Sequence, residues 1–381
     1  MKAGTDHLQT STGRPRLEAL DSLRGLASLA VLLGHTMAVC QWDPGFSSWL
    51  FINNLFDGRS AVTMFFVLSG FVLALGHVSA EARPIVLVPF YGRRITRIWL
   101  PWFAIFLISL IARQFLLLPY PQTIPPVSAH HTSFWSNEYS FSDILRQMVF
   151  LLHDSTKMLL PQDWSLGVEL KASLLIPVII WLARKELPLL IIATIAVAWL
   201  KPTGGYYYAS FGIGVIAAYA YTGTNRLPNG VVLACIGIIL YQIRWFHHFT
   251  DLLPHYMAEC EVWMLGSVAC ALILLGSLKC RMLQRTLELR LLAHLGRISY
   301  SLYLVQLIVL LCAAPWIVAF LNWIGIQSEF WLQILLLTIV TTICVILADY
   351  GERWIEVPCI RLGKCLTDRL DKNRWVRKLI I

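Results

Sequence analysis

The sequence is poor in charged residues. Of its 381 residues, only 14% are Asp, Glu, Lys or Arg, whereas 57% are hydrophobic. A soluble globular protein carries about a quarter charged residues, so the composition excludes an ordinary soluble domain. The sequence therefore predicts an all-α integral membrane protein, a polytopic bundle of about ten transmembrane helices.

Other absences narrow the class further. The nine cysteines are an odd number, and most lie in apolar runs or in segments expected to be cytoplasmic, which argues against a disulfide framework. The net charge of +9 comes from basic residues scattered through short loops, without a dense patch or a nucleic-acid motif. We therefore expect a lipid bilayer around the chain, no nucleic-acid partner and no metal site.

Ten apolar runs are candidate membrane spans. A span needs about twenty mostly apolar residues to cross roughly 30 Å of hydrocarbon. Lys and Arg collect on the cytoplasmic side of a membrane, and residues 119–143 contain neither. This charge distribution fits an even number of spans with both termini cytoplasmic. The runs are centred near Ala30, Leu68, Phe106, Ile176, Ala193, Ile213, Ile236, Ala269, Ile308 and Leu337.

The organisation of the chain is simple. The first twenty residues are polar and lead into a full-length apolar run, which is not the pattern of a cleavable signal peptide. We predict a cytoplasmic N-terminal tail over residues 1–19, one transmembrane domain over residues 20–352 and a basic cytoplasmic C-terminal tail over residues 353–381. The C-terminal tail is too short to form a core of its own.

The first apolar run contains two ionisable side chains, Arg24 and His35. Eleven residues at about 100° each make close to three whole turns, so both side chains share one helix face about 16 Å apart along the axis. Asp21 lies one turn before Arg24 and can pair with it. Ionisable side chains inside a span are by default functional, although a histidine can also serve only to bond a neighbouring helix.

Two further charged motifs follow. Arg94 and Arg97 lie one turn apart at the cytoplasmic start of the third span, where the positive-inside rule alone accounts for arginines. Because a guanidinium binds phosphate in bidentate fashion, they also predict, with Arg24, a site for a phosphate-bearing anion. We place Glu169 at the outer end of the fourth span, where it either pairs with Lys171 or acts in catalysis or acceptor binding.

Two polar stretches lie inside other spans. In residues 58–76, small residues such as Ser69 and Gly70 indicate close helix packing. In the ninth span, several hydroxyl groups and one amide indicate the wall of a polar cavity and thus substrate binding. These residues are Ser299, Tyr300, Ser301, Tyr303 and Gln306, and all of them except Ser301 are substrate-binding candidates.

Six motifs occur in one order along the chain: LDSLRGLASLAVLLGH, FFVLSGF, RRITRIWLPW, WSLGVE, ISYSLYL and RWIEVPCIRLG. In this order they resemble the membrane-bound acyltransferase 3 family. The family's arginine and histidine, separated by ten residues, match Arg24 and His35. Its paired arginines match Arg94 and Arg97.

The chain departs from the family pattern at two positions. After Glu169 the family usually continues with a glutamine and aromatic residues, whereas here the sequence reads LKAS. The family often has a histidine soon after SLYL, where this chain has Gln306, which can form hydrogen bonds but cannot carry a proton.

The resemblance implies an enzyme in the inner (plasma) membrane. It implies transfer of an acyl group, most often acetyl, from cytoplasmic acyl-CoA to a hydroxyl of an extracytoplasmic or lipid-linked carbohydrate. No permanently bound cofactor is expected, since acyl-CoA is the donor substrate. In this interpretation His35 is either general base or nucleophile, Arg24 and Glu169 complete the catalytic group, and Arg24, Arg94 and Arg97 bind the donor.

Two other classes of protein fit parts of the sequence. A transporter or flippase of a lipid-linked sugar would use the polar residues of the spans as a permeation path, but the inverted repeats typical of such proteins are not evident. A membrane scaffold without catalysis explains the loops but not the polar residues of the first span.

Overall fold

The computed structural model describes residues 18–39, 58–78, 84–114, 138–149, 158–199, 204–223, 227–243 and 255–371. Within these ranges the chain forms helices and short connections and contains no β-strand, which confirms the all-α class. The helices are α1 (Glu18–Val39), α4 (Gly58–Leu75), α5 (Leu87–Ala112), α7 (Phe141–Met148), α8 (Asp163–Lys185), α9 (Leu187–Trp199), α10 (Gly205–Gly223), α11 (Gly230–Ile243), α12 (His255–Lys279), α13 (Arg281–Leu287), α14 (Arg290–Cys312), α15 (Ala314–Trp323), α16 (Glu329–Gly351), the π-helix η4 (Glu352–Glu356) and α17 (Val357–Asp371).

These helices account for the apolar runs of the sequence. All ten predicted span centres lie on a helix, and α15 is a shorter apolar helix not among the ten. The chain is therefore a multi-pass helical membrane protein, whereas the count of ten and the cytoplasmic termini remain predictions. In the described ranges, six helical stretches are long and apolar enough to cross a membrane: Gly58–Leu75, Leu87–Ala112, Asp163–Lys185, Cys260–Lys279, Arg290–Cys312 and Glu329–Asp368.

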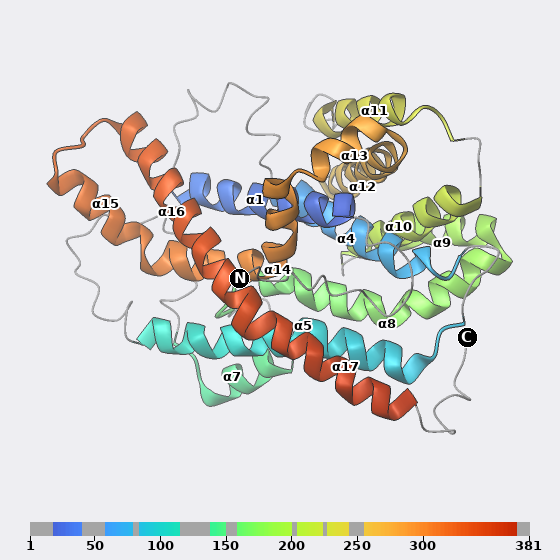
Figure 1. Ribbon diagram of the computed structural model, residues 1–381, viewed down its shortest axis with the longest axis horizontal. Coiled ribbons are helices and arrows are strands. Elements are labelled where there is room, and N and C mark those ends of the chain that lie inside the picture. Colours follow the sequence, from blue (N-terminus) through green and yellow to red (C-terminus); the bar gives the residue numbers. More distant parts are fainter. Residues whose placement is uncertain are drawn as a thin grey trace, which may run out of the picture.

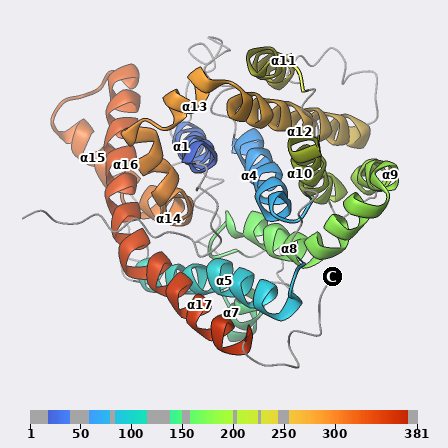
Figure 2. The same ribbon diagram turned by 45° about the vertical axis from the view of Figure 1, so that its right-hand side comes forward.

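Helix α1 lies near the middle of the bundle. It packs against α14 on one side and α4 on the other, as Figures 1 and 2 show. Helix α4 packs in turn against α10. In Figure 2, α5, α8 and α17 form the layer below α1, and α5 contacts α8, α14 and α17. The predicted site residues thus come from four helices, α1, α5, α8 and α14, that form one connected group.

Glycines let the central helices approach closely. A Cβ atom added to Gly70 of α4 would overlap the carbonyl oxygen of Phe211 in α10. One added to Gly25 of α1 would come within 2.5 Å of the backbone nitrogen of Gly296 in α14. Small residues of this kind are the usual means of close helix association in membranes. The sequence-based prediction that Gly70 serves helix packing is therefore confirmed.

We expect Gly70→Val to destabilise the bundle, because no space exists for a branched side chain between α4 and α10. Overpacking a core costs about 1–3 kcal/mol, so the apparent melting temperature in detergent should fall. Gly58→Val, in the first turn of the same helix, is the matched control, since nothing lies within 4 Å of a Cβ atom added there. Equal melting temperatures for the two variants would contradict the close approach of α4 to α10.

The C-terminal helix α17 packs on α5 through two reciprocal glycine and threonine pairs. A Cβ atom added to Gly363 would overlap the Thr96 side chain, and one added to Gly92 would lie 2.8 Å from Cγ2 of Thr367. Each threonine hydroxyl donates to a carbonyl oxygen of its own helix at 2.9 Å, so both hydroxyls are satisfied inside the contact. The predicted C-terminal tail, residues 353–381, thus contains a helix that belongs to the bundle.

The π-helix η4 joins α16 to α17. At its end, the N–H of Val357 donates to the carbonyl oxygen of Glu352, five residues earlier. The next residue, Pro358, has no N–H, and in a regular helix its ring would clash with the carbonyl of Trp354. The wider π-turn relieves this clash, and π-turns occur frequently at functional sites. It also directs Glu356 inward, where it is only 7% exposed.

Candidate active site

Helix α1 carries both ionisable side chains of the first predicted span. It is continuous from Glu18 to Val39, so Arg24 and His35 share one face about 16 Å apart along the axis. The Arg24 guanidinium donates to the Asp21 carboxylate at 2.9 Å, and each of the two side chains is 19% exposed. His35 is half-buried, and its Nδ1 atom is shielded from solvent. An ion pair and an imidazole thus stand at the two ends of one helix face.

The register between α1 and α14 sets the level of His35. The hydroxyl of Ser28 donates to the carbonyl oxygen of Ser299 at 2.6 Å, and this pair is 271 residues apart in sequence. Gly25 and Gly296, which are in contact one turn earlier, have the same separation in sequence, so the two helices run parallel. The same separation places His35 at the level of Gln306, two turns further along.

Arg94 of α5 is held by α8. Its Nη2 atom donates to Glu169 Oε1 at 2.9 Å, and its Nε atom donates to the hydroxyl of Ser173 at 3.2 Å. The hydroxyl of Ser69 donates to the same Glu169 oxygen at 2.9 Å. The Arg94 and Glu169 side chains are only 11% and 19% exposed. This largely buried network therefore ties α4, α5 and α8 together.

The position of Glu169 corrects two expectations from the sequence. The sequence analysis places Glu169 at the outer end of its span and Arg94 at the cytoplasmic start of another span, on opposite sides of the membrane. The ion pair puts them at one level, because α8 begins at Asp163 and Glu169 lies almost two turns inside it. Glu169 also pairs with Arg94 and not with Lys171, which lies about 200° away around the helix.

Arg97 differs from the other two arginines of the site. It is exposed, and within the described part of the chain it forms no ion pair or hydrogen bond. Its charge nevertheless acts on Arg24, Arg94 and Tyr300, and also on the carboxylate of Glu356 in η4, so all three guanidinium groups belong to one cluster. Arg24 and Arg94 each hold a carboxylate. Arg97 is therefore the guanidinium best placed to bind an external anion.

A second polar layer surrounds Tyr303 of α14. Its hydroxyl lies 2.6 Å from the hydroxyl of Ser165 and donates to the carbonyl oxygen of Gln162 at 3.1 Å. Next to them, at the first residue of α8, lies the Asp163 side chain, which is only 1% exposed. Hydroxyl, amide and carboxylate groups thus meet where α8 begins.

The four substrate-binding candidates of α14 lie in three different places. Tyr300 donates to the carbonyl oxygen of Ile98 at 2.6 Å and belongs with the arginines. Tyr303 belongs to the second layer, and the amide of Gln306 donates to its carbonyl oxygen at 3.2 Å. Ser299 is buried where α14 packs on α1, so its environment is that of a helix contact.

The structure adds residues to which the sequence analysis gives no role in the site. Asp163 directly precedes the WSLGVE motif, Ser173 ends the LKAS stretch that follows it, and the sequence analysis interprets Ser69 as a packing residue. Glu356, in the late motif, accepts a hydrogen bond from Ser301 at 3.0 Å. The one signal available in the sequence was the presence of polar and acidic side chains inside apolar runs.

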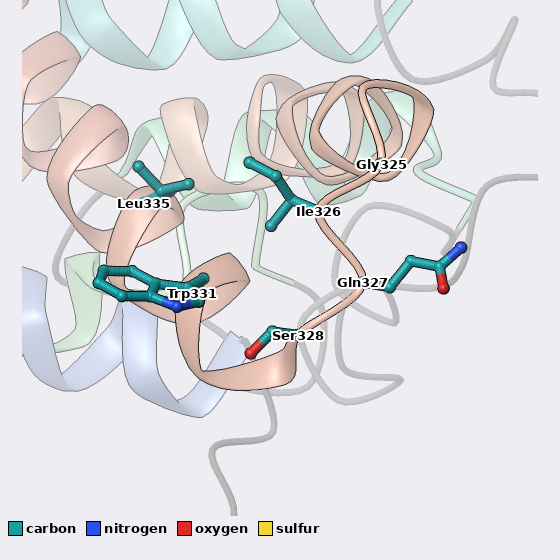
Figure 3. Close-up of a pocket in the computed structure, with 6 residues that line it drawn as sticks. All are labelled: Gly325, Ile326, Gln327, Ser328, Trp331 and Leu335. Atoms are coloured by element: carbon teal, nitrogen blue, oxygen red, sulfur yellow. The ribbon is translucent and has the colours of Figure 1, made fainter.

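A pocket lies away from this cluster, at the turn that joins α15 to α16. The two helices form a hairpin that projects from the bundle at the left of Figure 1. Figure 3 shows that the lining residues come from this turn and the start of α16, and none of them is a predicted site residue. They are Gly325, Ile326, Gln327, Ser328, Trp331 and Leu335.

Comparison with known proteins gives one match. The sequence model of a protein family, the acyltransferase 3 family, described as an acyltransferase domain, matches residues 17–350. This range runs from the start of α1 to one residue before the end of α16 and includes every predicted site residue. No curated protein sequence and no solved structure matches the chain.

Proposed function

Because this chain belongs to the membrane-bound acyltransferase 3 family, we propose that it transfers an acyl group, most often acetyl, from cytoplasmic acyl-CoA to a carbohydrate hydroxyl. The carbohydrate is extracytoplasmic or lipid-linked, and the membrane is the inner (plasma) membrane. The single observation that carries this proposal is the arrangement along α1. Three arginines gather at one end of a helix face whose other end carries a half-buried histidine.

The arginine cluster suits the donor. Coenzyme A carries a diphosphate and a separate phosphate, and guanidinium groups bind such oxygens through paired hydrogen bonds. Arg97 is exposed and forms no hydrogen bond or ion pair in the described part of the chain, although its charge acts on Glu356, so it meets the phosphates first. Arg24 and Arg94 add positive potential from within the bundle. The thioester then extends along the face of α1 toward His35.

His35 supplies the proton chemistry. As general base, it takes the proton of the acceptor hydroxyl while the hydroxyl oxygen attacks the thioester carbonyl and the coenzyme A thiolate leaves. As nucleophile, its ring nitrogen would attack the thioester carbonyl and displace the coenzyme A thiolate, and the acceptor hydroxyl would then take the acyl group from the ring nitrogen and lose its proton. Gln306 and Tyr303 offer hydrogen-bonding groups near the level of His35, where a sugar hydroxyl can be held.

The proposal is tested by the ester content of the carbohydrates of the cell envelope. We expect proton NMR of these extracted carbohydrates to show ester-linked acyl groups in cells that express the gene. The signal should be absent from cells that lack the gene and restored when it is returned on a plasmid. If no ester depends on the gene, the proposed acceptor is wrong. Transport of a lipid-linked sugar is then the next activity to assay.

A further inference from the structure

The contact between α5 and α17 fixes which residues of the two helices are neighbours. Gly92 of α5 faces Thr367, and Thr96 faces Gly363, so the helices are antiparallel and one step forward on α5 is one step back on α17. Continuing this register places Arg97 at the level of residue 362. Its neighbours along α17 are therefore cations on either side of that level.

Four exposed cations lie on the same flank of this helix pair. Going around α5 from the line of contact, Arg93 and Arg97 lie at about 80° and 120°. Going the same way around α17, Lys364 and Arg361 lie at about 80° and 140°. Because the helices are antiparallel, equal senses of rotation lead to one side of the pair. All four side chains are exposed. Arg93 and Lys364 lie closest together, Arg97 and Arg361 lie toward the two edges, and we call the four the α5–α17 basic strip.

The strip is continuous with the buried site. Arg97 belongs to both, because it lies three residues after Arg94 on the continuous helix α5 and its charge also acts on Arg24 and Arg94 inside the bundle. Those two arginines already hold carboxylates. A ligand with several phosphate groups therefore needs further cations, and those at neighbouring levels are Arg93 on α5 and the two cations of α17. Asp368 shares the flank, about 9 Å from Arg97 along the axis but only one helical turn after Lys364.

We propose that α17 supplies the second half of the phosphate-binding surface, with Arg361 and Lys364 binding, beside Arg97, the phosphate groups of the acyl-CoA donor. This inference rests on the proposed function, because it takes acyl-CoA as the donor. It gives the C-terminal helix a role in donor recognition. The glycine and threonine contacts then serve to hold the two cations next to α5.

The test measures coenzyme A binding to purified full-length protein in neutral phosphatidylcholine nanodiscs. We expect the double variant Arg361→Gln/Lys364→Gln to raise the Kd about 5- to 30-fold at low ionic strength, and less in high salt. The matched control is Arg281→Gln/Arg285→Gln, which removes two exposed cations from α13 and should leave the Kd unchanged. Dephospho-coenzyme A, which lacks one phosphate, should bind the wild type more weakly than coenzyme A does.

The outcomes separate this inference from the proposed function. Suppose that coenzyme A binds the wild type and that Arg97→Gln weakens binding, but that the α17 double variant binds as the control does. The proposed role of α17 is then wrong, whereas acyl-CoA remains supported as the donor. If the wild type binds no coenzyme A, both are wrong. If the double variant weakens binding only in nanodiscs containing anionic lipid, the strip binds the membrane surface, which also overturns the proposal. Unchanged melting temperatures show that the variants are folded.

Discussion

Replacing His35 with alanine should reduce acyl transfer by about 10²- to 10⁴-fold, the range that a positioned general base contributes. The binding of coenzyme A should stay within a factor of two, because His35 lies about 16 Å along α1 from the arginine cluster. The effect should therefore fall on kcat. The measurement is transfer of radiolabelled acetyl groups from acetyl-CoA to extracted envelope glycan by purified protein, alongside a binding isotherm.

His35→Gln distinguishes better between a catalytic and a merely hydrogen-bonding role of His35. Glutamine keeps a hydrogen-bonding side chain of similar length but cannot take a proton at neutral pH. If His35 only bonds a neighbouring helix, His35→Gln should transfer almost as fast as the wild type, and the catalytic assignment would be wrong. Incubation with labelled acyl-CoA in the absence of acceptor then separates the two chemistries, since only a nucleophilic His35 leaves label on the protein.

The helices and the shared face of Arg24 and His35 could be predicted from the sequence because both depend on local periodicity. Apolar runs of about twenty residues become helices, and a spacing of eleven residues returns to the same face. Neither inference requires knowledge of what lies opposite. The structure agrees with both, since every predicted span centre lies on a helix and α1 is continuous through both residues.

The different environments of Arg94 and Arg97 could not be predicted. In sequence they are equivalent, one turn apart in a basic motif. Only the packing of α8 on α5 brings Glu169, 75 residues later, against one arginine and not the other. For the same reason the charged segment after residue 353 is predicted as a tail. Its contact with α5 depends on two glycines that carry no signal of their partner.

The Arg94 and Glu169 pair should be among the most sensitive positions for stability. Removing one partner of a buried ion pair leaves an uncompensated charge and costs about 3–5 kcal/mol. We therefore expect Arg94→Leu and Glu169→Leu each to lower the apparent melting temperature strongly. The double variant, Arg94→Leu/Glu169→Leu, should recover much of this loss, because well-packed apolar residues can replace a buried pair at little cost.

An exposed ion pair in the same bundle is the matched control. Arg297 and Asp349 lie 3.4 Å apart, with side chains 44% and 28% exposed. An exposed pair contributes about 0–1 kcal/mol, so Arg297→Leu should change the melting temperature little. If Glu169→Leu is no more damaging than Arg297→Leu, the Arg94 and Glu169 pair does not hold α5 and α8 together as a buried ion pair. If instead Arg94→Leu is stable but fails to bind coenzyme A, Arg94 binds donor directly, and Arg97 is not the main contact of the cluster.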